Sequence, residues 1–149
     1  MSGPSSPDRV VPLWDLVQTA HLAERRFSEV FSAAGLTPAQ YGVLASLDDG
    51  DDLSQADLAR SVLVRPQSMA RLITDMVAAG LVVRDGAGGR GRRTGLHATA
   101  AGHAALAQAR PAAYALNTPE ALGLDPRQLH LLCELLRTVR QHLLDRHAS

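Results

Sequence analysis

The sequence predicts a mainly helical protein with one small β-hairpin, and three observations lead to this fold class. Apolar residues recur at spacings of three and four over most of the chain, which is the period of a helix with one buried face. Capping signals such as TPAQ, SQAD and DPRQ open several of these segments. Between residues 81 and 97, short strand-like runs flank a glycine-rich turn, which indicates a hairpin.

The composition fits a single folded domain. The chain has 149 residues, 46% of them hydrophobic and 20% charged, which is enough apolar material for a core. No apolar run reaches the length of a membrane span, and residues 1–8 lack the features of a signal peptide. We therefore expect a cytoplasmic protein that does not enter a membrane. The single cysteine, Cys133, excludes an internal disulfide.

The elements follow in a definite order along the chain. In that order, the expected elements are helices at about 8–34, 38–47, 54–62 and 66–80, strands at 81–85 and 93–97, and helices at 99–116 and 125–145. The helix at 66–80 has a set of apolar residues that we expect to face inward, namely Met69, Leu72, Ile73, Met76 and Val77. The third and fourth helices, the tight turn between them and the hairpin make the pattern of a helix-turn-helix followed by a wing.

The positive charge is concentrated on this pattern. The net charge is zero, which by itself argues against a nucleic-acid-binding protein. Residues 1–57, however, hold three arginines and nine acidic residues, whereas residues 58–97 hold seven arginines and two aspartates. The basic block coincides with the second helix of the helix-turn-helix and with the tip of the hairpin. This distribution favours nucleic-acid binding by one surface of the molecule.

Four segments resemble the multiple-antibiotic-resistance-regulator (MarR) family of winged helix-turn-helix transcription factors. Residues 36–44, LTPAQYGVL, are similar to that family's L-T-x-x-Q-[FWY]-x-V-L helix. The pair LA at 58–59, then PQSM at 66–69 and MVAAGLVVR at 76–84, resemble its recognition helix and first wing strand. TAAG at 99–102 resembles the start of its fifth helix. The chain departs from the pattern in the wing, where GRR at 91–93 replaces the usual Asp-Arg-Arg.

The resemblance implies one domain, residues 1–149, built as a winged helix-turn-helix core flanked by long N- and C-terminal dimerisation helices. The DNA-binding lobe is expected at about 36–98, and the dimerisation helices at about 8–34 and 100–145. The wide apolar stripes of the terminal helices agree with this, because a small winged core cannot cover both of them. A homodimer would place its two recognition helices about one DNA turn apart, on a pseudo-palindromic operator in double-stranded DNA.

A recognition helix presents its N-terminal residues to base edges in the major groove, where Gln pairs with adenine and Arg with guanine. Arg65 is better placed for a phosphate, and arginines of the wing suit a narrow minor groove. The expected DNA-binding residues are Arg65, Gln67, Ser68, Arg71, Thr74, Arg90, Arg92 and Arg93. The alternative is that they are a solvated helix face and a loop kept soluble by its arginines.

Members of the MarR family often bind a small anionic or aromatic ligand between the dimerisation helices and the DNA-binding lobe. Trp14, His21 and Arg25 share one face of the first helix and are candidates to line such a cleft. Trp14 and Asp57, together with a wing arginine, resemble the set of urate-responsive members. The alternatives are that Trp14 is a core residue and that Asp57 is only the carboxylate of a capping box.

We therefore expect a homodimeric DNA-binding regulator, a repressor that a small-molecule effector releases. No Ser-His-Asp grouping, carboxylate pair or Cys-His dyad indicates a catalytic site, so we do not expect an enzyme or a cofactor. His130 and Cys133 lack further ligands at zinc-finger spacing, so no metal site is expected. The alternative function is a winged-helix protein-interaction module without DNA binding. An enzyme that uses the fold only to dimerise is a more remote one.

Overall fold

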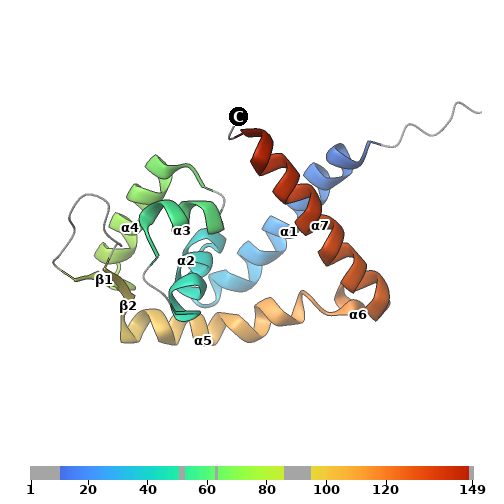
Figure 1. Ribbon diagram of the computed structural model, residues 1–149. Coiled ribbons are helices and arrows are strands. Elements are labelled where there is room, and N and C mark those ends of the chain that lie inside the picture. The colour runs from blue at the N-terminus through green and yellow to red at the C-terminus, as the bar shows by residue number, and fades with distance from the viewer. Residues whose placement is uncertain (1–10, 51–52, 63, 86–94, 148–149) are drawn as a thin grey trace, which may run out of the picture. The chain divides into compact units, whose positions relative to one another are not determined.

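The computed structural model describes residues 11–50, 53–62, 64–85 and 95–147 (Figure 1). The elements are α1 (Pro12–Ser32), α2 (Pro38–Asp48), α3 (Gln55–Val62), α4 (Pro66–Ala78), β1 (Val82–Arg84), β2 (Leu96–Ala98), α5 (Ala100–Ala115), α6 (Pro119–Leu122) and α7 (Pro126–His147). The expected fold class, mainly helical with a small hairpin, is confirmed. No helix in these ranges is long and apolar enough to cross a membrane.

The capping signals begin the helices where the sequence predicted them. In α2, the Thr37 side chain accepts a hydrogen bond from the Gln40 amide, and the Gln40 side chain accepts one from the Thr37 amide. Asp125 and Gln128 make the same reciprocal pair at the start of α7. Each box satisfies two amides that would otherwise lack a partner at a helix N-terminus, and such caps are worth about 1 kcal/mol.

Two local expectations are corrected by the structure. The return strand begins at Leu96 and not at residue 93, because Gly95 has φ +56, a left-handed conformation that no strand residue adopts. Residues 119–122 form the short helix α6, which the sequence analysis did not predict although Thr118 and Pro119 are a cap and a first helical residue. The Thr118 side chain accepts a hydrogen bond from the Ala121 amide.

The chain divides into two compact units, residues 1–110 and 111–149. The first unit holds α1 to α4, the hairpin and α5 up to Arg110; the second holds the rest of α5, α6 and α7. The division falls at Pro111, which lies inside α5 and has no amide hydrogen to continue the helical ladder.

The core of the first unit joins α1 to the helices that follow it. Phe31 stacks between Phe27 and Tyr41, with ring centroids 5.4 Å and 4.2 Å apart. Aromatic pairs of this kind add about 0.5–1.5 kcal/mol to the free energy of burial. The side chains that are fully buried around this stack are Val43, Leu44, Leu58, Met69, Ile73, Met76 and Val82.

The apolar face of α4 is narrower than expected. Met69, Ile73 and Met76, at spacings of four and three, are fully buried. Val77 was expected to face inward and instead is 40% exposed. Val77 follows Met76 by about 100° of helix rotation, which takes it to the edge of the buried face and towards solvent.

The first turn of α5 packs directly on the backbone that links α4 to β1. The Thr99 amide donates to the Leu81 carbonyl, and the Thr99 hydroxyl donates to the Gly80 carbonyl. Thr99 also caps α5, since its hydroxyl oxygen accepts from the Gly102 amide. A Cβ on Gly102 would lie 2.1 Å from the Leu81 carbonyl oxygen, so only glycine permits this approach.

The Gly102→Ala substitution tests this contact. Because the added methyl group would force backbone apart, we expect the free energy of unfolding to fall by about 1–3 kcal/mol. The matched control is Gly42→Ala in α2, where the nearest atoms, at 3.3 Å, belong to the flexible Val62 side chain. Urea denaturation followed by circular dichroism measures both. Equal free energies of unfolding for the two variants would contradict the conclusion that only glycine at residue 102 permits this close approach.

Candidate nucleic-acid interface

Helix α4 presents a continuous polar face to solvent. Pro66 occupies its first turn, and Arg65 is its N-cap residue without a side-chain capping bond. The residues predicted to contact DNA from this helix are all exposed, namely Arg65, Gln67, Ser68, Arg71 and Thr74. The Thr74 hydroxyl donates to the Ala70 carbonyl at 3.0 Å, so its oxygen keeps lone pairs that can accept a hydrogen bond. The buried Met69–Ile73–Met76 stripe on the opposite face sets this orientation.

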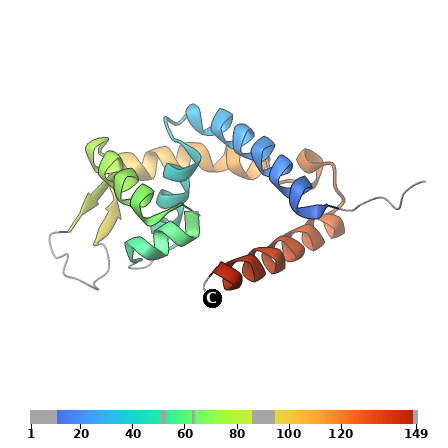
Figure 2. The same cartoon turned by 90° about the horizontal axis from the view of Figure 1, so that it is seen from above.

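The hairpin lies beside α4 (Figure 2). β1 and β2 pair antiparallel, with Val82 opposite Ala98, Val83 opposite His97 and Arg84 opposite Leu96. We call this hairpin, with the residues that join its strands, the wing. The predicted contacts Arg90, Arg92 and Arg93 lie outside the described residues and stay predictions.

The described wing residues nearest to the joining segment form what we call its neck: Asp85, Gly95 and His97. The Asp85 amide donates to the Gly95 carbonyl at 2.7 Å, one hydrogen bond beyond the paired strands. His97 Nε2 lies 2.7 Å from Asp85 Oδ2. The sequence analysis did not single out this pair, because the two residues meet only through the strand register.

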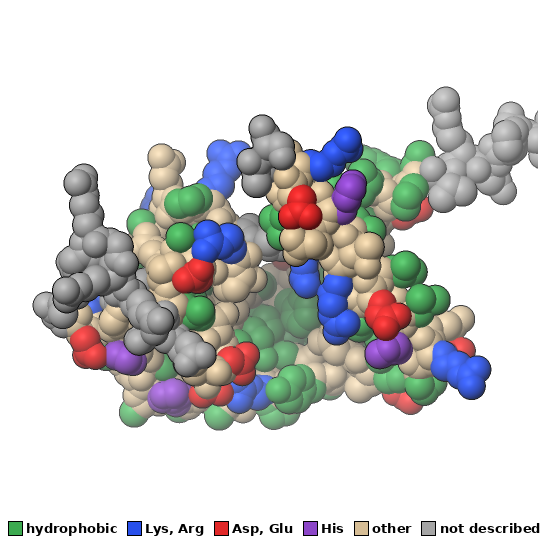
Figure 3. All heavy atoms as spheres, viewed as in Figure 1, with side chains coloured by type: hydrophobic (Ala, Val, Ile, Leu, Met, Phe, Trp, Pro, Cys, Tyr) green, Lys and Arg blue, Asp and Glu red, His purple; other side chains and the backbone are tan. Residues whose placement is uncertain are grey.

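Several arginine side chains reach the surface of this part of the lobe (Figure 3). Arg65 and Arg71 on α4 and Arg84 on β1 are exposed. Guanidinium groups bind phosphate and guanine through planar pairs of hydrogen bonds, so these positions suit a nucleic-acid backbone and base edges.

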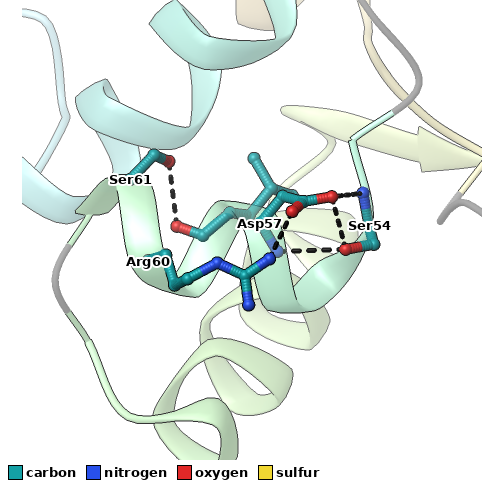
Figure 4. A network of polar contacts seen from close by, with 5 residues as sticks. Ser54, Asp57, Arg60 and Ser61 are labelled. Carbon is teal, nitrogen blue, oxygen red and sulfur yellow. Dashed lines mark hydrogen bonds and ion pairs between the residues drawn. The ribbon is translucent and has the colours of Figure 1, made fainter. Parts of the chain in front are cut away.

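Arg60 on α3 is held by a network at the start of that helix (Figure 4). It forms an ion pair with Asp57 Oδ1. Asp57 Oδ2 accepts hydrogen bonds from the Ser54 amide at 2.9 Å and the Ser54 hydroxyl at 2.6 Å. These hydrogen bonds from Ser54, with the Arg60 guanidinium, lower the pKa of the Asp57 carboxyl below its ordinary value of 3.8.

The four candidate ligand residues lie on two separate helices. Trp14, His21 and Arg25 are exposed on α1, and Trp14 is 60% exposed, so the alternative that Trp14 is a core residue of this chain is wrong. Asp57 lies on α3, and the alternative that it closes a capping box is confirmed by its bonds to Ser54. Their role in ligand binding stays a prediction.

Comparisons with known proteins agree with this geometry. A family model described as the MarR family matches residues 34–93. A protein of Thauera aromatica described as a transcriptional regulatory protein for the hcr operon is 34% identical over 87 residues, which cover 58% of this chain and 52% of the relative. The chain thus spans about half the length of that curated relative.

Solved structures extend the similarity over most of the chain. The Mycobacterium tuberculosis MarR family protein Rv2887, in complex with salicylic acid, is 26% identical with a TM-score of 0.68; the match covers 89% of this chain and 98% of that one. The M. tuberculosis transcriptional regulator MosR, in complex with DNA, is 23% identical with a TM-score of 0.68 and the same coverage, which shows a shared fold.

The exposed α4 face and the hairpin beside it define a winged helix-turn-helix protein. The MarR family model matches residues 34–93, which include α2, α3, α4 and β1, and the fold is similar to that of solved MarR family proteins.

The Asp57→Asn substitution tests the network on α3. A carboxyl whose pKa is lowered in the folded state contributes stability above its unfolded pKa and loses it as the pH falls through the folded value. We therefore expect the variant to melt at a lower temperature than the wild type at pH 7. The difference should narrow as the pH drops below about 3.8.

Thermal melts between pH 7 and pH 2.5, read by circular dichroism, check this behaviour, with Asp75→Asn, an exposed aspartate of α4, as control. A wild-type–Asp57→Asn difference that stays constant over this range would contradict the network's contribution.

Proposed function

We propose that the protein is a homodimeric transcriptional regulator that binds a specific sequence in double-stranded DNA, and that it represses transcription until a small molecule releases it. The observation that carries this proposal is the exposed polar face of α4, with Arg65 and Arg71, beside the arginine-bearing wing. The match of residues 34–93 to the MarR family model and the fold shared with a protein solved on DNA support it.

Each predicted residue receives a physical role. With α4 in the major groove, Gln67 and Arg71 read base edges, and Ser68 and Thr74 supply hydroxyl groups. Arg65, at the uncapped start of α4, binds a phosphate. Arg90, Arg92 and Arg93 of the wing enter the adjacent minor groove, where the negative potential is deepest.

A second copy of the chain covers the apolar faces that α1 and α7 expose. The exposed large apolar residues of α7 are Leu131, Leu132, Leu135, Leu136, Val139, Leu143 and Leu144. Those of α1 are Leu13, Trp14, Val17 and Leu22. Monomeric soluble proteins rarely leave such contiguous apolar surface in water, and a two-fold dimer buries it while pairing two recognition helices.

The effector that we propose is a small aromatic or anionic molecule. Trp14 offers an aromatic face and Arg25 a cation, while His21 and Asp57 offer polar groups. The M. tuberculosis relative solved with salicylic acid supports this ligand class. We place the regulator in the cytoplasm, where the DNA of a bacterial cell lies, and assign it no catalytic activity.

The alternative is a winged-helix module that binds another protein and not DNA, which the net charge of zero favours. Salt separates the two functions, because displacing counterions from DNA makes the affinity fall steeply with ionic strength. Selecting genomic fragments on the purified protein, and titrating a recovered duplex at rising salt, tests the proposal. If no preferred duplex is recovered, the proposed sequence-specific DNA binding is contradicted. Adding salicylate to the protein–DNA complex tests whether a small aromatic anion releases the protein from DNA.

Substitution of the recognition and wing arginines should affect binding differently. We expect Arg71→Ala to weaken binding to the selected duplex by about 1–3 kcal/mol and to relax specificity at one base pair. Arg92→Ala should weaken binding to all sequences more evenly. Fluorescence anisotropy measures both, with Arg26→Ala on α1 as control. Wild-type affinity in both variants would remove the two assignments.

Substitution in the apolar stripe of α7 should break the dimer. Leu132, Leu136, Val139 and Leu143 lie on one side of the helix, so Leu136→Glu would bring a charge into the interface. We expect a shift to monomer, measured by light scattering during size-exclusion chromatography, and a loss of DNA affinity. The control is Arg137→Glu on the same helix. A Leu136→Glu variant that stays dimeric at low micromolar concentration would contradict the proposed interface.

A further inference from the structure

The neck of the wing carries a histidine–carboxylate pair that the functions above do not use. Asp85 directly follows β1 and His97 is the middle residue of β2, and both are solvent-accessible, with side chains 69% and 55% exposed. Val83 pairs with His97, and Asp85 follows Val83 by two residues, so Asp85 and His97 point to the same side of the hairpin. The pair therefore links the two strands on one side of the neck, at the end of the hairpin farthest from α5 in the chain.

The charged groups around His97 are few among the described residues. On the other side of the hairpin, Leu96 is buried where β2 packs on α2. The titratable groups of α2 are Tyr41 and Asp48, and Asp48 lies against Arg110 and His103. On β1, Arg84 occupies the alternate side from Asp85. Helix α4, which packs on β1, adds Arg71 and Asp75, both exposed. Within the described part of the chain, Asp85 is thus the carboxylate that contacts His97.

The charge of this pair depends on one proton. With His97 neutral, Asp85 leaves a negative charge at the base of the wing, within the range at which it repels DNA phosphates at physiological salt. With His97 protonated, the pair is neutral and its hydrogen bond is charge-assisted, which ties the two strand ends more firmly. Histidine is the side-chain type that ordinarily exchanges a proton near neutral pH.

We propose that Asp85 and His97 form a proton-linked clamp that positions the wing, so that DNA binding is accompanied by protonation of His97. The inference rests on the proposed DNA binding and adds a regulation to it. Phosphates near the wing stabilise the protonated imidazole, and by linkage a protonated imidazole raises the affinity for DNA. The protein then binds its duplex more tightly as the pH falls from 8 to 6.

The test compares dissociation constants at pH 6, 7 and 8 and constant ionic strength, using the duplex recovered by selection. For the wild type we expect binding about three- to tenfold tighter at pH 6 than at pH 8, which lies within the limit of about a hundredfold that one linked proton sets over two pH units. The His97→Gln variant should lose this pH dependence of the dissociation constant. Asp85→Asn should bind more tightly than the wild type at pH 8, because the repelling carboxylate is gone.

The chain supplies matched controls in two other histidine–carboxylate pairs. His103 Nδ1 lies 3.6 Å from Asp48 Oδ1, and His130 Nε2 lies 3.2 Å from Glu134 Oε1. The variants His103→Gln and His130→Gln should keep the pH dependence of the wild type. A pH dependence that persists unchanged in His97→Gln, or that disappears in a control as well, would overturn the clamp.

A second measurement uses the unaltered protein and does not depend on the folding of any variant. The ring-proton resonances of His97 are followed by NMR against pH in the free protein and in the DNA complex. A titration midpoint at higher pH in the complex supports the inference, and an equal or lower one overturns it. Absence of DNA binding at every pH would overturn the proposed function as well, whereas intact binding without this shift would overturn the clamp alone.

Discussion

The contact between the first turn of α5 and the backbone of Leu81 is the constraint on which the proposed DNA-binding surface depends. Thr99 bonds to the carbonyls of Gly80 and Leu81, and Gly102 allows the helix to approach without a side chain between them. Residues 80 and 81 link the end of α4 to β1, and residue 99 links β2 to α5. This close approach therefore holds the end of α4 and the base of the hairpin against the first turn of α5, and with them the spacing between α4 and the hairpin.

The distribution of charged residues matters more for this molecule than its net charge. A chain with a net charge of zero attracts DNA only if its cations are gathered and its anions are kept away or neutralised. Among the residues that the structure describes, no acidic side chain forms an ion pair with Arg65 or Arg71, whereas Arg60 pairs with Asp57 at the start of α3. Asp85 is the acidic residue next to the wing tip, and His97 faces it. The electrostatic potential at the proposed DNA interface therefore depends more on a few pairs of charged residues than on the overall composition.

The two units of the chain differ in how they bury their apolar side chains. The first encloses a core around Phe31, Leu44 and Ile73 and presents its arginines outward. In the second, the described part of α7 leaves apolar side chains from Leu131 to Leu144 partly exposed, and the proposed dimer would remove them from water. The winged helix-turn-helix therefore has its own core within one chain, whereas the apolar face of α7 is the part that the proposed association would cover.

The order of elements and every helix except α6 follow from local signals, namely the capping boxes at Thr37, Ser54 and Asp125 and a period of 3.6. The polar face of α4 from Arg65 to Thr74 follows in the same way, since Met69, Ile73 and Met76 lie on the opposite side. Only the tertiary structure decided the start of β2 at Leu96, the exposure of Val77 and the meeting of Asp85 with His97. These depend on strand register and on how far a neighbouring element covers a face, and both are set by contacts between residues distant in sequence.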